Sequence, residues 1–221
     1  MSSSIYRFYQ DVIPLLLKGL LLTLKISGFS VFLGLSLGFL LGILQSEHFK
    51  NRFMQPIIAL YVSMIRGTPL FLQVLLVYFA IPEAIGIDID PITAGVISLS
   101  INASAYITEI VRAGMNSVDD SQWNAGLALG YSKVQVLYYL ILPQAMRTIL
   151  PSLAGELSTV VKESGVMMVI GAPELLKISR DLAARTLMPL EIYLVAAAMY
   201  LAVTICLSKF ARFLEARFKW A

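Results

Sequence analysis

Long apolar stretches dominate this chain of 221 residues and constrain its fold more than any other feature. A helix that spans a bilayer needs roughly 20 mostly apolar residues. Stretches of about this length cover the segments Leu15–Leu44, Pro56–Ile81, Ile92–Val111, Thr148–Ile170 and Leu190–Phe210. Only 14% of the residues are charged, whereas a soluble domain has about 25%. The sequence therefore predicts an all-α integral membrane protein with about five transmembrane helices.

The predicted organisation is one transmembrane domain over residues 15–210, preceded by an extracytoplasmic segment (1–14) and followed by a cytoplasmic tail (211–221). Cytoplasmic loops of membrane proteins are enriched in lysine and arginine. Four basic residues lie at the end of the chain: Lys209, Arg212, Arg217 and Lys219. We therefore expect the N-terminus outside and the C-terminus inside. The net charge of +3 is interpreted as this topology signal, so no nucleic-acid partner is expected.

Small residues recur every four positions in the first apolar stretch, at Ser30, Gly34, Gly38 and Gly42. This spacing places them on one face of a helix, where a second helix can approach closely. We expect helix packing along this face, and a substrate groove is the alternative.

The segment 112–147 is too long and too polar for a simple turn between two spans. It contains a helical stretch, Gln122–Leu129, then Gly130, then a second amphipathic stretch that ends at Leu142–Pro143. We expect two short helices separated by a glycine, which would form a structured hairpin. The residues alone leave two interpretations open: a surface that docks on another protein, or an ordinary loop packed on its own helices.

The stretch NAGLALGYSKVQVLYYLILP, Asn124 to Pro143, resembles the EAA loop of ATP-binding-cassette (ABC) importer permeases. The positions that fit the family pattern are Ala125, Gly130, Ile141, Leu142 and Pro143. Asn124 replaces the usual glutamate and Gly126 replaces the usual second alanine. The loss of the glutamate removes a charge, although asparagine can still cap a helix.

Three further stretches resemble permeases for histidine, arginine, glutamine, glutamate and related amino acids. They are YVSMIRGTPLFLQVLLVYF (Tyr61–Phe79), the segment Ala105–Gly130 that leads into the loop, and VVKESGVMMVIGAPELL (Val160–Leu176). The resemblance implies a type I ABC importer permease (MetI-like) fold, in the cytoplasmic (inner) membrane of a bacterium.

The resemblance also implies the partners and the coupling residues. A second permease subunit (an identical copy or a paralogue), two ABC ATPase subunits and an extracytoplasmic amino-acid-binding protein would complete the transporter. The ATPase would hydrolyse ATP, and this chain itself is expected to bind no cofactor and no metal. The ATPase-coupling residues would be Asn124, Ala125, Gly126, Gly130 and Pro143. Ala125 and Gly126 would keep the contact face small, and Gly130 would adopt a special backbone conformation or allow close approach.

Charged residues at membrane depth are costly and usually face a cavity or a partner. The fourth apolar stretch carries Ser152, Glu156, Thr159 and Glu163 at helical spacing on one face. Glu156 is the candidate substrate-binding carboxylate, which would favour basic amino acids and is compatible with glutamine. The alternative is a structural carboxylate paired with a neighbour such as Arg66 or Lys162.

Two further polar sets complete the candidate substrate path. Asn102 lies deep in the third stretch, whereas Glu109 and Arg112 lie near its end and are expected to form a structural pair. Arg66-Gly67-Thr68-Pro69 interrupts the second stretch, because proline disturbs the preceding helical turn. A gate and a packing kink are both compatible with this break. Gln73 follows it and is expected to face the pore.

Three other functions fit the sequence less well. A permease for another small solute is disfavoured by the RGTP and KES segments. A membrane serine protease needs a base, and the only histidine, His48, lies in a short charged loop. We find no phosphate-binding glycine loop, so the chain is not expected to be an enzyme. A passive channel has no use for a docking hairpin.

Overall fold

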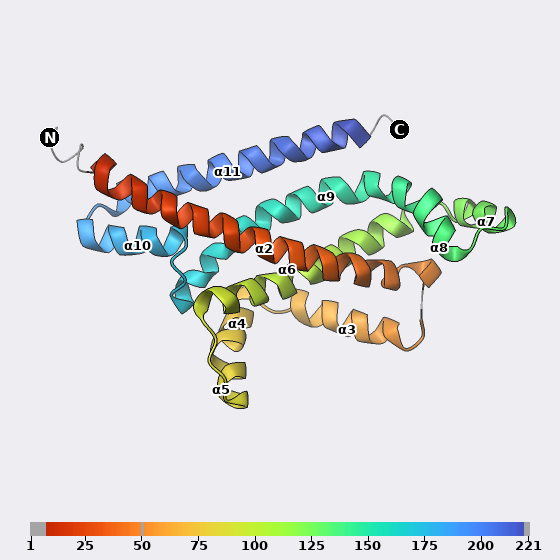
Figure 1. The fold of residues 1–221 in the computed structure, drawn as a ribbon, viewed down its shortest axis with the longest axis horizontal. Helices are drawn as coiled ribbons and strands as arrows, with labels where there is room; N and C mark the ends of the chain where they lie inside the picture. The colour runs from red at the N-terminus through yellow and green to blue at the C-terminus, as the bar shows by residue number, and fades with distance from the viewer. Residues whose placement is uncertain (1–7, 50, 219–221) are drawn as a thin grey trace. The chain divides into compact units, whose positions relative to one another are not determined.

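The computed structural model describes residues 8–49 and 51–218, and the described residues are helices joined by short connections, with no strand among them (Figure 1). The α-helices are α2 (Ile13–Gln45), α3 (Met54–Arg66), α4 (Leu70–Leu75), α5 (Ile81–Ile85), α6 (Pro91–Asn116), α7 (Asp120–Ala128), α8 (Lys133–Val136), α9 (Leu142–Glu163), α10 (Leu175–Thr186) and α11 (Pro189–Phe218). The π turns are η1 (Phe8–Val12), η3 (Leu76–Ala80) and η4 (Leu137–Ile141), and the 3-10 turns are η2 (Glu47–Phe49) and η5 (Ser164–Ile170).

The chain divides into two compact units. Unit 1 comprises residues 1–32, 68–101 and 158–206, and unit 2 comprises residues 33–67, 102–157 and 207–221. The helices α2, α6, α9 and α11 each contribute residues to both units.

Unit 1 has a core where the N-terminal half of α2 packs on α10 and the start of α11. Its buried residues are Val12, Leu16, Leu175, Leu182, Ala183, Ile192 and Ala196. A Cβ atom at Gly19 would lie 3.0 Å from the Leu175 Cα atom, so α2 approaches α10 closely there. Ser30 Oγ donates to the Val96 carbonyl oxygen at 3.3 Å and joins α2 to α6 within this unit.

Unit 2 packs the C-terminal half of α2 against α6 through small residues. A Cβ atom at Gly38 would lie 2.6 Å from the Ser104 carbonyl oxygen, and one at Gly42 would lie 2.6 Å from Val111 Cβ. No side chain larger than hydrogen fits at either position without displacing α6. The prediction that this face of α2 serves helix packing is therefore confirmed at Gly38 and Gly42.

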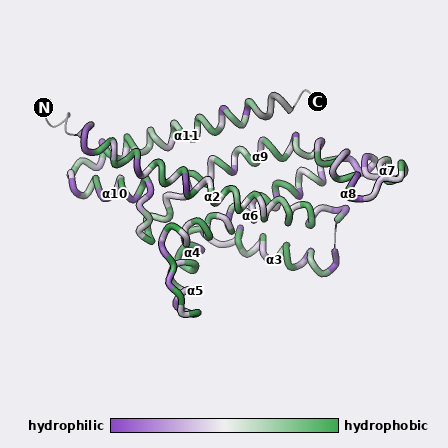
Figure 2. The backbone as a smooth tube through the Cα atoms, viewed as in Figure 1, coloured by the Kyte–Doolittle hydropathy of each residue, from purple (hydrophilic) through white to green (hydrophobic). Residues whose placement is uncertain are grey.

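The all-helical membrane fold class is confirmed, but the helices do not repeat the five expected spans one for one. Within the described residues, three helical segments can cross a membrane by length and composition: Gln10–Gln45, Pro91–Asn116 and Pro189–Phe213. Figure 2 shows the mostly apolar colouring of α2. The bent pair Met54–Arg66 and Leu70–Ile85 adds a fourth if it is counted as one span.

The second and fourth expected spans differ from the observed helices for local reasons. The second expected span is not continuous, because Pro69 is extended (φ −62°, ψ 136°) between α3 and α4. The fourth expected span lies on α9 and η5. The helix α9 is not among the candidate spans, since it is less apolar and carries proline, arginine, serine and glutamate along its length. The positions of the two chain ends relative to the membrane stay a prediction.

Candidate functional site

The expected hairpin is present and is built by strong local signals. Asp119 caps α7, because its carboxylate accepts a hydrogen bond from the Ser121 backbone N–H at 2.8 Å. Ser132 begins α8 with a reciprocal capping box to Gln135. Hydrogen bonding from the side chain and backbone of Ser121 holds the pKa of Asp119 below its ordinary value. Asn124, which was expected to be able to cap a helix, lies in the interior of α7 instead.

Gly130 ends α7 in the left-handed region, with φ at +84°. The Gly130 N–H donates to the Leu127 carbonyl at 3.0 Å, and the Tyr131 N–H donates to the Gly126 carbonyl at 3.2 Å. This pair of bonds is a Schellman motif. The prediction of a special backbone conformation is confirmed, and no close approach within this chain calls for the glycine, because a Cβ atom would meet nothing within 4 Å. Close approach to an ATPase stays a prediction.

The second arm of the hairpin is longer than expected. The sequence predicted an end at Leu142–Pro143, but the chain stays helical from α8 through η4 into α9. Pro143 is the second residue of α9, and only Leu142 separates it from the π turn, which ends at Ile141. A π turn changes the local backbone pairing, which accommodates a residue that has no N–H to donate.

The two faces of α7 differ in character. Asn124 and Ala125 are exposed, as a docking face requires, whereas Trp123 and Gly126 are buried. A Cβ atom at Gly126 would lie 2.7 Å from Leu140 Cδ1 and 2.8 Å from Val136 Cγ2. The small size of Gly126 therefore serves packing inside the hairpin and not an outward contact.

Exposed apolar side chains also lie along the hairpin. They are Leu127, Leu129, Tyr131, Val134, Tyr138 and Tyr139, of which Leu129 is the most exposed at 76%. Pro143 is exposed as well. Apolar groups gathered on one structured hairpin are typical of a protein interaction surface.

One contact to α7 was not anticipated from the sequence. The ring of His48 in η2 stacks on Trp123 with centroids 4.2 Å apart and an interplanar angle of 11°. His48 Nε2 lies 3.4 Å from Asp120 Oδ1. Phe49 meets Trp123 edge to face at 5.7 Å.

The candidate substrate-path residues of unit 2 are Glu156, Asn102 and Arg66. Asn102 is buried in α6 and Glu156 is half-buried in α9. Arg66 lies 3.9 Å from Glu109 and its guanidinium is 5.2 Å from the Tyr106 ring centroid. Arg112 donates to Glu109 at 2.9 Å, which confirms the expected Glu109–Arg112 pair. Both interpretations of Glu156 stay predictions.

The other candidate residues, Thr68, Gln73, Thr159 and Glu163, belong to unit 1. Gln73 is buried, and its amide Nε2 donates to the Thr68 carbonyl oxygen at 3.1 Å and to Thr68 Oγ1 at 3.0 Å. Gln73 thus supplies a donor at the break that Pro69 creates. Thr159 and Glu163 are half-buried in the last turns of α9.

Glu174 is a second residue that the sequence reasoning missed. It is fully buried and caps α10 by accepting from the Leu176 and Lys177 backbone N–H groups at 2.9 and 2.7 Å. Tyr200 OH donates to the same carboxylate at 3.0 Å, and the Leu175 N–H donates to Thr23 Oγ1 at 3.1 Å. The side chain therefore joins α10 to α11 within unit 1. The acidic residue before an apolar run was the available signal.

The fold and the hairpin are those of a helical membrane protein in which a structured, exposed hairpin connects two of the long helices. Residues 34–220 match the family described as binding-protein-dependent transport system inner membrane component. The chain belongs to this family, whose role is that of a membrane permease working with a binding protein. The membership confirms the resemblance carried by Asn124–Pro143.

Curated relatives cover nearly the whole chain. The arginine transport system permease protein ArtQ of Bacillus subtilis (strain 168) is 37% identical over 207 residues, which cover 94% of each chain. The glutamine transport system permease protein GlnP of Escherichia coli (strain K12) is 38% identical over 208 residues, again 94% of each chain.

Solved structures agree with the fold. A chain of an amino acid ABC transporter with histidines superposes with a TM-score of 0.86 at 34% identity, covering 97% of both chains. A chain of the MetNI methionine ABC transporter in an inward facing conformation gives a TM-score of 0.83 at 18% identity, covering 93% of this chain and 97% of that one. The second likeness shows the fold alone.

Proposed function

We propose that this chain is the permease subunit of an ABC importer that carries polar amino acids, with basic amino acids and glutamine as the substrate class. The observation that carries the proposal is the α7–α8 hairpin, with its exposed Asn124–Ala125 face and its left-handed Gly130. The names of relatives for arginine and glutamine transport support the substrate class.

The hairpin requires a partner that supplies energy. Each of two ABC ATPase subunits would dock on the hairpin of one permease subunit and hydrolyse ATP. The second permease subunit is an identical copy or a paralogue, and an extracytoplasmic binding protein delivers the amino acid. The complex would lie in the inner membrane of a bacterium, with the hairpin on the cytoplasmic side.

Glu156 supplies the chemistry for substrate choice. A half-buried carboxylate attracts the ammonium or guanidinium of a basic amino acid and also accepts hydrogen bonds from a glutamine amide. Hydrogen bonds to charged groups contribute about 1.5–3 kcal/mol, which is roughly a 10- to 100-fold difference in affinity. Asn102, buried on α6 in the same unit, would add neutral donors and acceptors.

The test is uptake in proteoliposomes that contain the permease, its ATPase and its binding protein. Labelled arginine, lysine, histidine, ornithine, glutamine and glutamate are offered with and without ATP. We expect ATP-dependent accumulation of basic amino acids, of glutamine, or of both. Uptake of none of the panel, or uptake without ATP, would contradict the proposal.

The role of Glu156 is tested by Glu156→Gln in the same vesicles. The change removes the charge but keeps the size, so uptake of basic amino acids is expected to fall roughly 10-fold or more, and glutamine uptake less. The matched control is Glu191→Gln, which neutralises an exposed carboxylate in the first turn of α11. Wild-type uptake of basic amino acids by Glu156→Gln would leave Glu156 a structural residue.

A further inference from the structure

The turn η2, which directly follows α2, contacts the docking helix α7 through aromatic side chains. His48 lies flat on Trp123 at 4.2 Å, and Phe49 meets the same indole edge to face at 5.7 Å. The sequence separation is large, so the contact joins two connecting segments that follow different spans. Both segments belong to unit 2.

The docking helix has two buried residues, and they attach it to different parts of unit 2. Gly126 packs on Val136 and Leu140, which belong to the second arm of the same hairpin. Trp123 is 1% exposed and packs on His48 and Phe49, outside the hairpin. The Trp123 contact therefore links α7 to the segment after α2.

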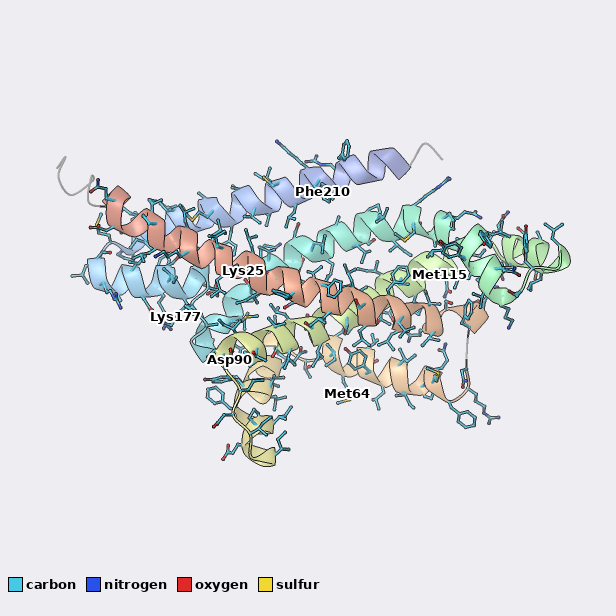
Figure 3. All side chains as sticks on the ribbon, in the orientation of Figure 1. Lys25, Met64, Asp90, Met115, Lys177 and Phe210 are labelled. Atoms are coloured by element: carbon cyan, nitrogen blue, oxygen red, sulfur yellow. The ribbon has the colours of Figure 1, made fainter. Side chains whose placement is uncertain are left out.

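The turn that carries His48 is itself held in place. Ser46 Oγ donates to the Ile43 carbonyl oxygen at 2.7 Å, which fixes the turn to the end of α2. The Glu47 N–H donates to Asn116 Oδ1 at 3.1 Å, which fixes it to the last residue of α6, next to Met115 labelled in Figure 3. A displacement of Trp123 would thus reach the ends of α2 and α6 through His48.

Stacking sets the orientation of the indole. Within the described residues, Trp123 Nε1 is buried and has no hydrogen-bond partner, so no polar contact at Nε1 fixes its ring plane. Near-parallel rings at this separation attract each other and resist separation. The imidazole face of His48, together with the edge contact of Phe49, therefore holds Trp123, and with it one side of α7.

We propose that His48 is a positioning residue that transmits motion between the docking helix and the spans α2 and α6, alongside the hairpin's own connection to α9. The inference rests on the proposed docking of an ATPase on α7. His48 touches neither substrate nor nucleotide in this role. Its ring face is the part that matters, and the contact of Nε2 with Asp120 is secondary.

The test compares coupling, measured as amino acid taken up per ATP hydrolysed, in the complete reconstituted transporter. His48→Ala removes the ring, and His48→Phe keeps a flat ring but removes both nitrogens. We expect His48→Ala to lower the ratio about two- to ten-fold, which is the scale of one aromatic pair, and His48→Phe to restore most of it. Phe53→Ala is the control, because Phe53 lies in the same connecting segment but is 78% exposed, and it is expected to leave the ratio unchanged.

An unchanged ratio in His48→Ala would overturn the inference, and so would a ratio in His48→Phe as low as in His48→Ala. If the His48→Ala complex fails to assemble, His48→Leu takes its place against His48→Phe. The two side chains are of similar bulk but only one has a ring face. Equal ratios in these two variants would also refute the role of stacking.

A second measurement does not depend on transport. The chain has two tryptophans, so in the isolated permease Trp220→Phe leaves Trp123 as the sole tryptophan, which selective excitation separates from the tyrosines. Acrylamide quenching of Trp123 is expected to increase about two-fold or more in His48→Ala and to return toward the parent value in His48→Phe. Equal quenching in all three proteins would show that His48 does not hold Trp123, whatever the substrate is. A parent complex that transports no amino acid would refute the proposed function and leave this readout intact.

Discussion

Substitutions at Gly130 separate backbone strain from steric clash at the end of the docking helix. Gly130 has φ at +84°, and a Cβ atom there would meet nothing within 4 Å. Within the hairpin itself, the cost of Gly130→Ala therefore comes from the left-handed conformation, which costs an L-residue about 1–2 kcal/mol. Asparagine tolerates this region better than alanine, whereas a β-branched residue tolerates it worst.

The expected consequence is a smaller population of the hairpin conformation that binds the ATPase. A penalty of about 1–2 kcal/mol lowers the apparent affinity by up to about 5- to 30-fold. The expected order of affinity is Gly130, then Gly130→Asn, then Gly130→Ala, then Gly130→Ile. Gly130→Asp adds a charge at the docking surface and is expected to abolish ATP-coupled uptake while the protein stays in the membrane.

The assay is a binding titration of the detergent-solubilised permease with its ATPase, followed by uptake in proteoliposomes. Gly28→Ala is the control, because a Cβ atom at Gly28 also meets nothing within 4 Å and Gly28 lies inside α2, where alanine is favoured. It is expected to leave both readouts unchanged. Wild-type affinity in Gly130→Ala, or an Asn variant as weak as the Ile variant, would refute the strain argument.

Three further outcomes are expected. Gly126→Val should disrupt the hairpin by about 1–3 kcal/mol through overlap with Leu140 and so reduce ATPase binding, and a variant that binds normally would contradict the inward packing. Because the pKa of Asp119 is lowered, its cap stabilises α7 above the unfolded-state pKa, and this contribution is lost only as the pH falls through the lower folded-state pKa. Titration of Asp119 should therefore not change ATPase binding between about pH 8 and pH 6. A loss of binding in this range that is absent from Asp119→Asn would contradict the prediction. Glu174→Ala should leave buried donors unpaired and lower the melting temperature, with about 1–3 kcal/mol of stability lost per donor. The control Glu83→Ala changes an exposed position and should not lower it. Equal melting temperatures in the two variants would refute a structural role for Glu174.

The hairpin was predictable because its signals are local. The glycine between two helical stretches and the apolar runs each act over a few residues, and their spacing resembles one family. The special conformation of Gly130 followed from the same logic. The inward orientation of Gly126 did not, because a helix of nine residues with weak amphipathicity does not reveal which face is covered.

The contacts that sequence reasoning missed join residues far apart in the chain. The sequence offers His48 only as a candidate base, because its stacking on Trp123 depends on how the segment after α2 meets α7. Glu174 was overlooked because its partners Thr23 and Tyr200 come from the first and last long helices. No local pattern encodes such pairings, because they arise only when the helices pack.

The break in the second span was predictable from the sequence only in part. Arg66-Gly67-Thr68-Pro69 marked an interruption in the sequence, and the structure places it between α3 and α4. The role of Gln73 was less accessible, because an amide expected to face a pore is buried and hydrogen-bonds to Thr68. The break leaves the Thr68 carbonyl oxygen available, and the amide of Gln73 donates to it.

The helical path from Lys133 to Glu156 contains no non-helical residue, since α8 passes through η4 into α9. At 1.5 Å per residue this path is about 35 Å long, which is comparable to the thickness of a bilayer. A push on the surface where an ATPase would sit is thus delivered by a single strut to the carboxylate that would hold the cargo. The strut bends most readily where its backbone hydrogen-bond ladder is interrupted, which is at the π turn and at Pro151 inside α9.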